Sequence, residues 1–168
     1  GVVAAAAALT ACSSTNEAVN QALIEGAVGG IVATDCKIGR SRYWAANATV
    51  PVNEISFRIV MTNVSSKPVT LSGDNFATTL DGTPIPPFNF SARDVGDADI
   101  WRTYDSLTIR PGEERSIALA YEISQPTYDS WYKSSRTVAV SFTCGNQRVT
   151  YTKNSRSDEI TVSDIETL

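Results

Sequence analysis

Alternation of apolar and polar side chains dominates the sequence after Lys37. It is clearest in three segments whose apolar positions are Ile55, Phe57, Ile59 and Met61; Ile117, Leu119, Tyr121 and Ile123; and Val138, Val140, Phe142 and Cys144. A period of two residues places successive side chains on opposite faces of an extended strand. Many of these apolar residues are β-branched or aromatic, types that fit a half-buried pleated surface. The pattern therefore predicts three long strands, each with one buried face.

Shorter stretches of the same character predict six further strands. They cover residues 38–44, 68–71, 75–80, 106–110, 147–153 and 159–162. Turn-forming pairs lie between them at Asp81-Gly82, Pro111-Gly112 and Gly145-Asn146, because glycine and asparagine tolerate positive φ and proline presets the φ of a turn. No helical period separates the strands, so we expect an all-β fold, an antiparallel β-sandwich of eight or nine strands.

The first eleven residues form an uncharged apolar run that ends at Cys12 and precedes a polar stretch, residues 13–16. A membrane-spanning helix needs about 20 apolar residues, whereas roughly 7 to 15 suit the hydrophobic region of a secretory signal. All 14 Lys and Arg lie at or beyond Lys37, so the charged start of such a signal is missing. We expect that the sequence begins inside a signal peptide and that residues 1–11 are its remnant.

The four residues Leu9-Thr10-Ala11-Cys12 resemble the lipobox of bacterial lipoproteins. The resemblance implies that Cys12 is acylated, for example with palmitate, and becomes the mature N-terminus, so that membrane lipid anchors the protein in the cell envelope. Ser13 after the cysteine implies the outer membrane if the cell has two membranes. The alternative is an alanine-rich helix in which Cys12 is a buried free thiol.

Residues 12–35 are expected to form a tether with a short amphipathic helix, ahead of a β-sandwich domain at residues 36–168. Helical spacing is present at Val19, Leu23, Ile24, Ala27 and Val28. Glycines 26, 29 and 30 weaken a helix but allow close approach of the backbone. The segment is therefore either a tether that docks on the domain or a small-residue packing face for a partner or membrane.

Three segments carry a second resemblance. They are residues 57–69, where a strand ends at Asn63 and a polar turn follows; residues 76–82; and residues 107–113, which end in Pro111-Gly112-Glu113. Together they resemble the small immunoglobulin-like domains of bacterial lipoproteins and secreted antigens. This resemblance implies an immunoglobulin-like sandwich outside the cytoplasm with no recurrent catalytic site.

Composition narrows the chemistry further. The 168 residues are 42% hydrophobic and 19% charged, as expected for one folded domain. The sequence has no histidine, which excludes Ser-His-Asp and Cys-His catalysis and histidine-containing zinc sites. A net charge of -4 makes nucleic acid an unexpected partner. No cofactor or metal is expected, since Asp94, Asp97 and Asp99 lack the spacing of an EF-hand.

Two cysteines remain once Cys12 is assigned to lipid. Cys36 and Cys144 are expected to form a disulfide, because two cysteines of an exported chain usually pair. Two buried thiols are the alternative, and only the distance between them decides.

Aromatic residues concentrate in two connections, residues 84–105 and 124–136, which the pattern leaves as loops. They are Phe88, Phe90, Trp101, Tyr104, Tyr128, Trp131 and Tyr132. Loop aromatics can anchor a protein partner, and they can also cap the end of a sandwich core. We expect these two connections, rather than a sheet face, to form the partner-binding surface.

The sequence thus favours a non-enzymatic, lipid-anchored envelope protein that binds or scaffolds protein partners. A second possibility is a subunit of a surface filament or envelope assembly that retains residues 1–35 as a packing helix. A hydrolase with a carboxylate pair is the third, and no motif in the sequence indicates it.

Overall fold

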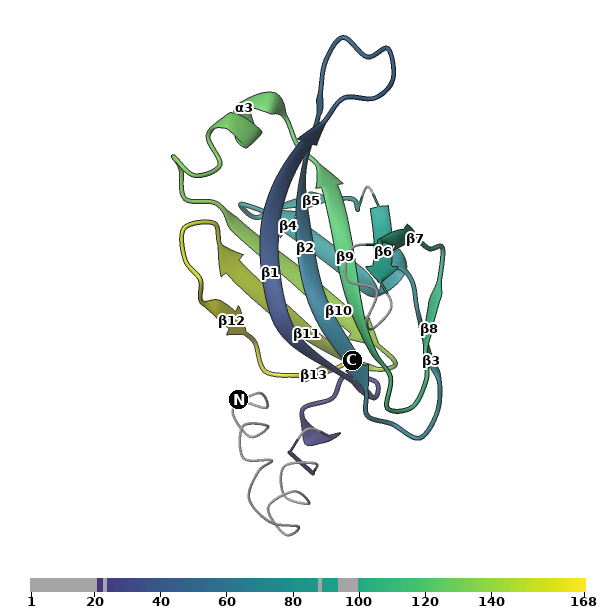
Figure 1. Cartoon of the computed structure of the whole chain (residues 1–168). Helices are drawn as coiled ribbons and strands as arrows, with labels where there is room; N and C mark the ends of the chain where they lie inside the picture. The colour runs from purple at the N-terminus through teal and green to yellow at the C-terminus, as the bar shows by residue number, and fades with distance from the viewer. Residues whose placement is uncertain (1–20, 23, 88, 94–99) are drawn as a thin grey trace.

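Two antiparallel sheets make up most of the computed structural model, which describes residues 21–22, 24–87, 89–93 and 100–168 (Figure 1). The first sheet has the order β1-β2-β9-β6-β7 and the second the order β12-β11-β10-β4-β5, with β13 also paired to β11. The first contains β1 (Ile31–Tyr43), β2 (Val52–Asn63), β9 (Glu114–Glu122), β6 (Asn89–Arg93) and β7 (Arg102–Thr103). The second contains β12 (Ile160–Val162), β11 (Gln147–Asn154), β10 (Thr137–Cys144), β4 (Phe76–Leu80), β5 (Thr83–Ile85) and β13 (Glu166–Thr167).

Three smaller elements complete the described chain. β3 (Val69–Leu71) and β8 (Leu107–Ile109) pair with each other as a separate two-stranded sheet. A 3-10 turn, η1 (Gly73–Asn75), precedes β4, and a short helix, α3 (Gln125–Asp129), lies between β9 and β10. None of the helices in the described part of the chain is long and apolar enough to cross a bilayer.

The all-β class and all nine strands expected from the pattern are present, but the number of strands is larger. Over the described residues the structure has thirteen strands rather than eight or nine. The additional ones are β5, β6, β7 and β13, which are two to five residues long. Pro84, Pro86 and Pro87 interrupt the alternation around β5 and β6, so the pattern there predicts a loop. The expectation that residues 84–105 form one loop is wrong, because β5, β6 and β7 lie wholly or partly within this range.

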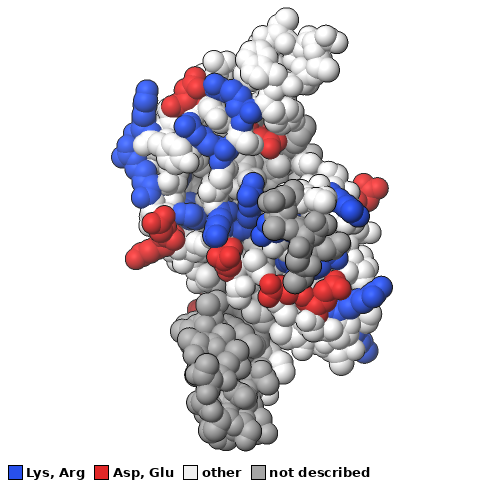
Figure 2. All heavy atoms as spheres, in the orientation of Figure 1, with Lys and Arg blue, Asp and Glu red and all other residues white. Residues whose placement is uncertain are grey.

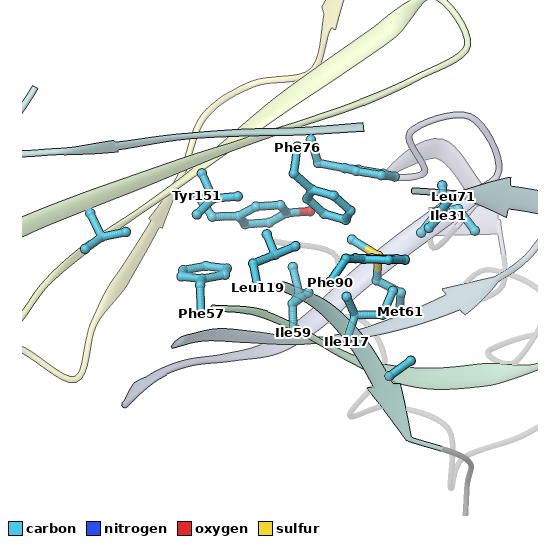
Figure 3. Close-up of a cluster of buried hydrophobic side chains, with 14 of the residues drawn as sticks. Ile31, Phe57, Ile59, Met61, Leu71, Phe76, Phe90, Ile117, Leu119 and Tyr151 are labelled. Carbon is cyan, nitrogen blue, oxygen red and sulfur yellow. The ribbon is translucent and has the colours of Figure 1, made fainter. Parts of the chain in front are cut away.

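The core lies between the two sheets. Along β2 every second residue from Asn53 to Asn63 is buried, and along β10 the same alternation holds from Val138 to Cys144. Figure 3 shows Phe57, Ile59 and Leu119 of the first sheet facing Phe76 and Tyr151 of the second. A hydrogen bond between the buried hydroxyls of Thr78 and Tyr121 joins the two layers. Full burial of one large apolar side chain contributes about 1.5–3 kcal/mol, so this shared core is the main source of stability.

The N-terminal boundary of the domain differs from the expectation. In the described residues the helix ends at Glu25, and β1 begins at Ile31 rather than after residue 35. Ala27, Val28, Ile31 and Val32 are buried in the core. The filament alternative expects a helix over residues 1–35. This expectation is wrong for residues 31–35, because a turn at Gly29 and Gly30 leads directly into β1. Residues 1–20, which include the lipobox and Cys12, lie outside the described residues.

That turn is formed by Gly29 and Gly30, whose φ angles are 57° and 85°. The Gly29 N–H donates to the side-chain oxygen of Gln147 at 3.0 Å, and the Cys144 thiol donates to the Gly29 carbonyl at 3.8 Å. A Cβ at position 29 would lie 2.5 Å from the Cys144 sulfur. The close backbone approach that these glycines allow is therefore made within the domain, to the β10–β11 hairpin.

Asn63 explains the polar turn after β2. Its side chain is fully buried, yet its amide donates to the carbonyls of Lys67 and Ile109, both at 2.8 Å. Its side-chain oxygen accepts from the Ser65 N–H and hydroxyl at 2.9 and 2.7 Å. A buried polar group costs little only when its hydrogen bonds are made. Here the bonds to Ser65 and Lys67 close the turn, and the bond to Ile109 ties it to β8.

Candidate functional site

The predicted disulfide is not present, because Cys36 and Cys144 are both free thiols. Cys144 packs against Gly29, seven residues before Cys36 in the chain, whereas Cys36 lies in β1 at the bulge between Thr34 and Lys37. Burial raises the pKa of the Cys36 thiol to about 12, and the neighbouring Asp35 carboxylate adds to this shift. Burial also raises the pKa of Cys144. Because the thiolate is the reactive form, these raised pKa values disfavour a nucleophilic role for either thiol.

The expected aromatic patch is divided by the fold. Trp131 is 1% exposed and Phe90 6% exposed, and the Phe90 ring lies 6.1 Å from that of Phe76. Both are packing residues of the core, so their assignment to a binding surface is wrong. Tyr104 is partly buried and packs against the core, and Phe88 lies outside the described residues. Of the seven aromatic residues, Trp101, Tyr128 and Tyr132 remain to be placed.

Tyr128 and Tyr132 join two arginines of β1 in a cluster that we call the Arg–Tyr stack. The guanidinium carbon of Arg40 lies 4.5 Å from the Tyr128 ring centre and 4.6 Å from that of Tyr132. The guanidinium carbon of Arg42 lies 4.1 Å from the Tyr128 ring centre. The Arg40 Nη1 also donates to the Tyr128 carbonyl at 2.6 Å, and Arg42 pairs with Asp129 at 2.9 Å. These contacts hold the α3 connection against the end of β1.

The connection from β1 to β2 projects beyond the sheets, and we call residues 43–51 the hairpin tip (Figure 1). It carries no charged residue, and Figure 2 shows this end of the molecule without blue or red side chains. Three large apolar side chains are exposed in it: Tyr43 at 41%, Trp44 at 61% and Val50 at 68%. Sequence reasoning missed this surface because Trp44 was expected to end a strand. The available signal was the uncharged run from Tyr43 to Asn53, which begins with two adjacent aromatic residues.

Trp101 lies elsewhere, on the outer surface of the first sheet. Its ring centre is 5.4 Å from the guanidinium carbon of Arg58 and 5.3 Å from that of Arg93. Together with neighbouring residues it lines an open pocket of about 110 Å³, which we call the sheet-face pocket. The residues that line it are Asp35, Lys37, Arg58, Ile59, Val60, Arg93, Trp101 and Ser116.

Within the described ranges, no three Cys, Asp or Glu side chains gather as they would around a metal ion. Asp94, Asp97 and Asp99 fall outside those ranges. The described residues offer two surfaces to consider: the hairpin tip with the Arg–Tyr stack at its base, and the sheet-face pocket.

Comparison with known proteins adds little to this geometry. No family model matches the sequence, and no curated protein matches it. A solved structure described as "Crystal structure of protein from Archaeoglobus fulgidus" is 11% identical, with a TM-score of 0.33. The similarity covers 80% of this chain and 98% of that one. At this level of similarity the functional argument depends on the chain's own residues.

Proposed function

We propose that the chain is a non-enzymatic lipoprotein of the cell envelope, anchored through acylated Cys12, whose domain is an immunoglobulin-like β-sandwich that binds a protein partner. Two observations support the architecture: antiparallel sheets pack on both sides of one core, and the Asn63 and Pro111-Gly112-Glu113 turns meet each other. The Gly112 N–H donates to the Asn63 carbonyl at 2.8 Å. The anchor is supported by the lipobox resemblance of residues 9–12.

The observation that carries the binding role is the exposure of Tyr43, Trp44 and Val50 at the hairpin tip. Soluble domains place most large apolar side chains in the core, so a projecting group of them marks an interaction site. Tryptophan and tyrosine are also the residues that contribute most at protein interfaces. The tip is held at its base by the Arg–Tyr stack, which reduces the ordering cost of binding.

The position of the tip fits an anchored protein. The chain enters β1 at Ile31 and the tip follows its other end at Tyr43. A strand of 13 residues spans roughly 40 Å at about 3.3 Å per residue. The chain that follows Cys12 therefore enters β1 at the end opposite the tip, an arrangement that fits an anchor at Cys12 and a partner at the tip.

A crosslinking experiment tests the binding role. A photo-reactive amino acid placed at Ala46, within the tip, should capture one defined protein in native membranes, and Trp44→Ala should reduce that capture at least about tenfold. The same probe at Val162, an exposed apolar position on β12, is the matched control and should not capture that protein. Equal capture from both positions, or capture that Trp44→Ala leaves unchanged, would contradict the proposal.

The anchor is tested separately. Cys12→Ala should move the protein from the membrane fraction to the soluble or unprocessed fraction, because the acyl chains supply the membrane affinity. Mass spectrometry of the native protein should find an N-terminal acylated Cys12. An unmodified Cys12 within a chain that still carries residues 1–11 would exclude the lipoprotein assignment.

A further inference from the structure

A third surface of the molecule is the outer face of the second sheet. In β10 every second residue from Val138 to Cys144 is buried, so Ala139 and Ser141 point outward. The register of β10 with β4 and β11, and of β11 with β12, continues this face across four strands. Its central positions form two rows, which we call the hydroxyl face: Ala77, Ser141 and Thr150 in one, and Thr79, Ala139, Thr152 and Thr161 in the other.

The hydroxyl face carries no charge and no large side chain. All of its residues are alanine, serine or threonine, and all are exposed or half-buried. The solvent-facing side of an antiparallel sheet is usually polar, and long charged side chains are common on it. The outer surface of the first sheet has such residues at Lys37 and Arg58. The hydroxyl face is instead flat, so a second flat surface can approach it closely.

Hydroxyl groups on this face already have hydrogen-bond partners within it. The Ser141 and Thr150 hydroxyls lie 2.9 Å apart and bond to each other across the strands. At the edge of the face, the Ser163 hydroxyl oxygen accepts from the Thr150 N–H at 2.9 Å. Removing water from a polar group costs most where no other hydrogen bond is made. The hydroxyl face can therefore be covered at a lower cost than a face of charged side chains.

Ion pairs border the hydroxyl face at both ends of its strands. Arg148 pairs with Glu166 at 2.7 Å beside one end, and Arg136 pairs with Asp81 at 3.0 Å beside the other. The Asp81 carboxylate also accepts from the Thr137 N–H at 2.8 Å. A centre without charges and a polar, charged rim is the usual arrangement of a protein–protein interface.

The size of the face fits contact with a second copy. Four strands about 4.8 Å apart span roughly 20 Å, and the eight residues of β10 span roughly 26 Å at about 3.3 Å per residue. Covering this area on two copies buries about 1,000 Å² in total, the lower limit for a specific interface. The net charge of -4 opposes contact between copies, but the hydroxyl face contributes no charge to that repulsion.

We infer that the hydroxyl face binds the same face of a second copy, so that the two outer sheet faces stack in a symmetric homodimer. A two-fold axis brings identical surfaces together, and a flat face without charges is complementary to itself. A charged partner would lose water from its charges without gaining counter-charges here. The contact goes beyond the proposed partner binding, because the hairpin tip projects past the end of the sheets and stays free in the dimer (Figure 1).

Two measurements on the intact, unmodified chain test this inference. Because the buried area is at the lower limit, sedimentation velocity should show conversion of monomer to dimer with a Kd of about 10–100 µM. In NMR spectra of the same samples, the Thr150 and Thr152 methyl signals should lose exposure to a soluble paramagnetic agent as the dimer forms. The Thr103 methyl signal, from an exposed position on the first sheet, should not.

Either of two results would overturn the inference. One is a chain that remains monomeric up to about 1 mM, ten times the weakest Kd expected. The other is a dimer in which Thr150 and Thr152 keep their full exposure, since the chain would then associate through another surface.

Matched variants locate the contact. Thr152→Lys places a charge within the hydroxyl face, twice in each symmetric dimer, and should weaken association at least about tenfold. Thr103→Lys makes the same change on the first sheet, and Thr152→Ser keeps a small hydroxyl side chain; both should associate as the unmodified chain does. Association of Thr152→Lys that equals that of the unmodified chain, or equal weakening in all three variants, would overturn the assignment to this face.

Discussion

The α3 connection and the β1–β2 hairpin tip lie at the same end of the molecule, and each carries one tryptophan. Trp131 of the first is 1% exposed, whereas Trp44 of the second is 61% exposed. Each tryptophan lies in a connection between two strands. Their different environments result from the path that the backbone takes after each strand.

In the α3 connection, local hydrogen bonds turn the chain back onto the core. The Ser124 side chain accepts from the Thr127 N–H and caps α3, and the Trp131 N–H donates to the Tyr128 carbonyl. In the hairpin tip, the Ala48 N–H donates a backbone hydrogen bond to the Ala45 carbonyl. It closes a turn without returning the chain to the sheet. Aromatic content by itself therefore does not distinguish an exposed loop from one that caps the core.

The largest expected effect concerns the two tryptophans themselves. Trp131→Ala should lower the free energy of unfolding by about 3–5 kcal/mol, because it leaves a cavity in the core. Trp44→Ala should change it by no more than about 0.5 kcal/mol, as for other exposed positions. Urea unfolding of both variants measures the difference. Similar losses in the two would show that the tip packs as the core does and would remove the distinction.

Two turns that contain glycine allow a similar comparison. The backbone is packed against the core at Gly29 and surrounded by open space at Gly82. Gly29→Ala should lower the free energy of unfolding by about 2–4 kcal/mol, since positive φ and overpacking against Cys144 both contribute. Gly82 has a φ of 81° but no atom within 4 Å of its Cβ position, so Gly82→Ala should cost only about 1 kcal/mol. Equal losses by urea unfolding would contradict the packing of the N-terminal turn.

Alkaline pH should lower the free energy of unfolding by less than these substitutions do, through the buried groups that titrate there. Burial raises the pKa of Cys36 and of Tyr121 to about 12, and also that of Tyr151. The unfolded chain loses these protons at lower pH than the folded one. The free energy of unfolding is therefore at its full value below about pH 9 and falls as the pH rises toward 12. At pH 10 Cys36 alone should account for about 1 kcal/mol.

Urea unfolding between pH 8 and 11 measures this fall. Cys36→Ala should make the free energy of unfolding fall less steeply at the start of this range. Trp44→Ala should leave its dependence on pH unchanged. A free energy of unfolding that is constant or increases over this range would show that Cys36 is accessible in the folded chain.

Sequence alone determined the all-β class, nine of the thirteen strands among the described residues, and the turns at Gly82, Gly112 and Gly145. The physical reason is that alternation and turn chemistry are local. Phe57 faces the core because its neighbours Ser56 and Arg58 are polar, and Gly82 and Gly112 adopt positive φ where turns require it. The absence of histidine and the lipobox resemblance are likewise properties of short segments, so no tertiary contact is needed to see them.

Only the tertiary structure decided which residues meet. Cys36 and Cys144 are free thiols, and Gly29 packs against the Cys144 sulfur. Lys37 lies opposite Arg58 because the register of β1 on β2 places them there. Trp131 is buried while Trp44 is exposed because one connection folds back and the other projects. Each of these outcomes depends on residues distant in the chain, whose separation in space is set by the packing of two sheets on one core.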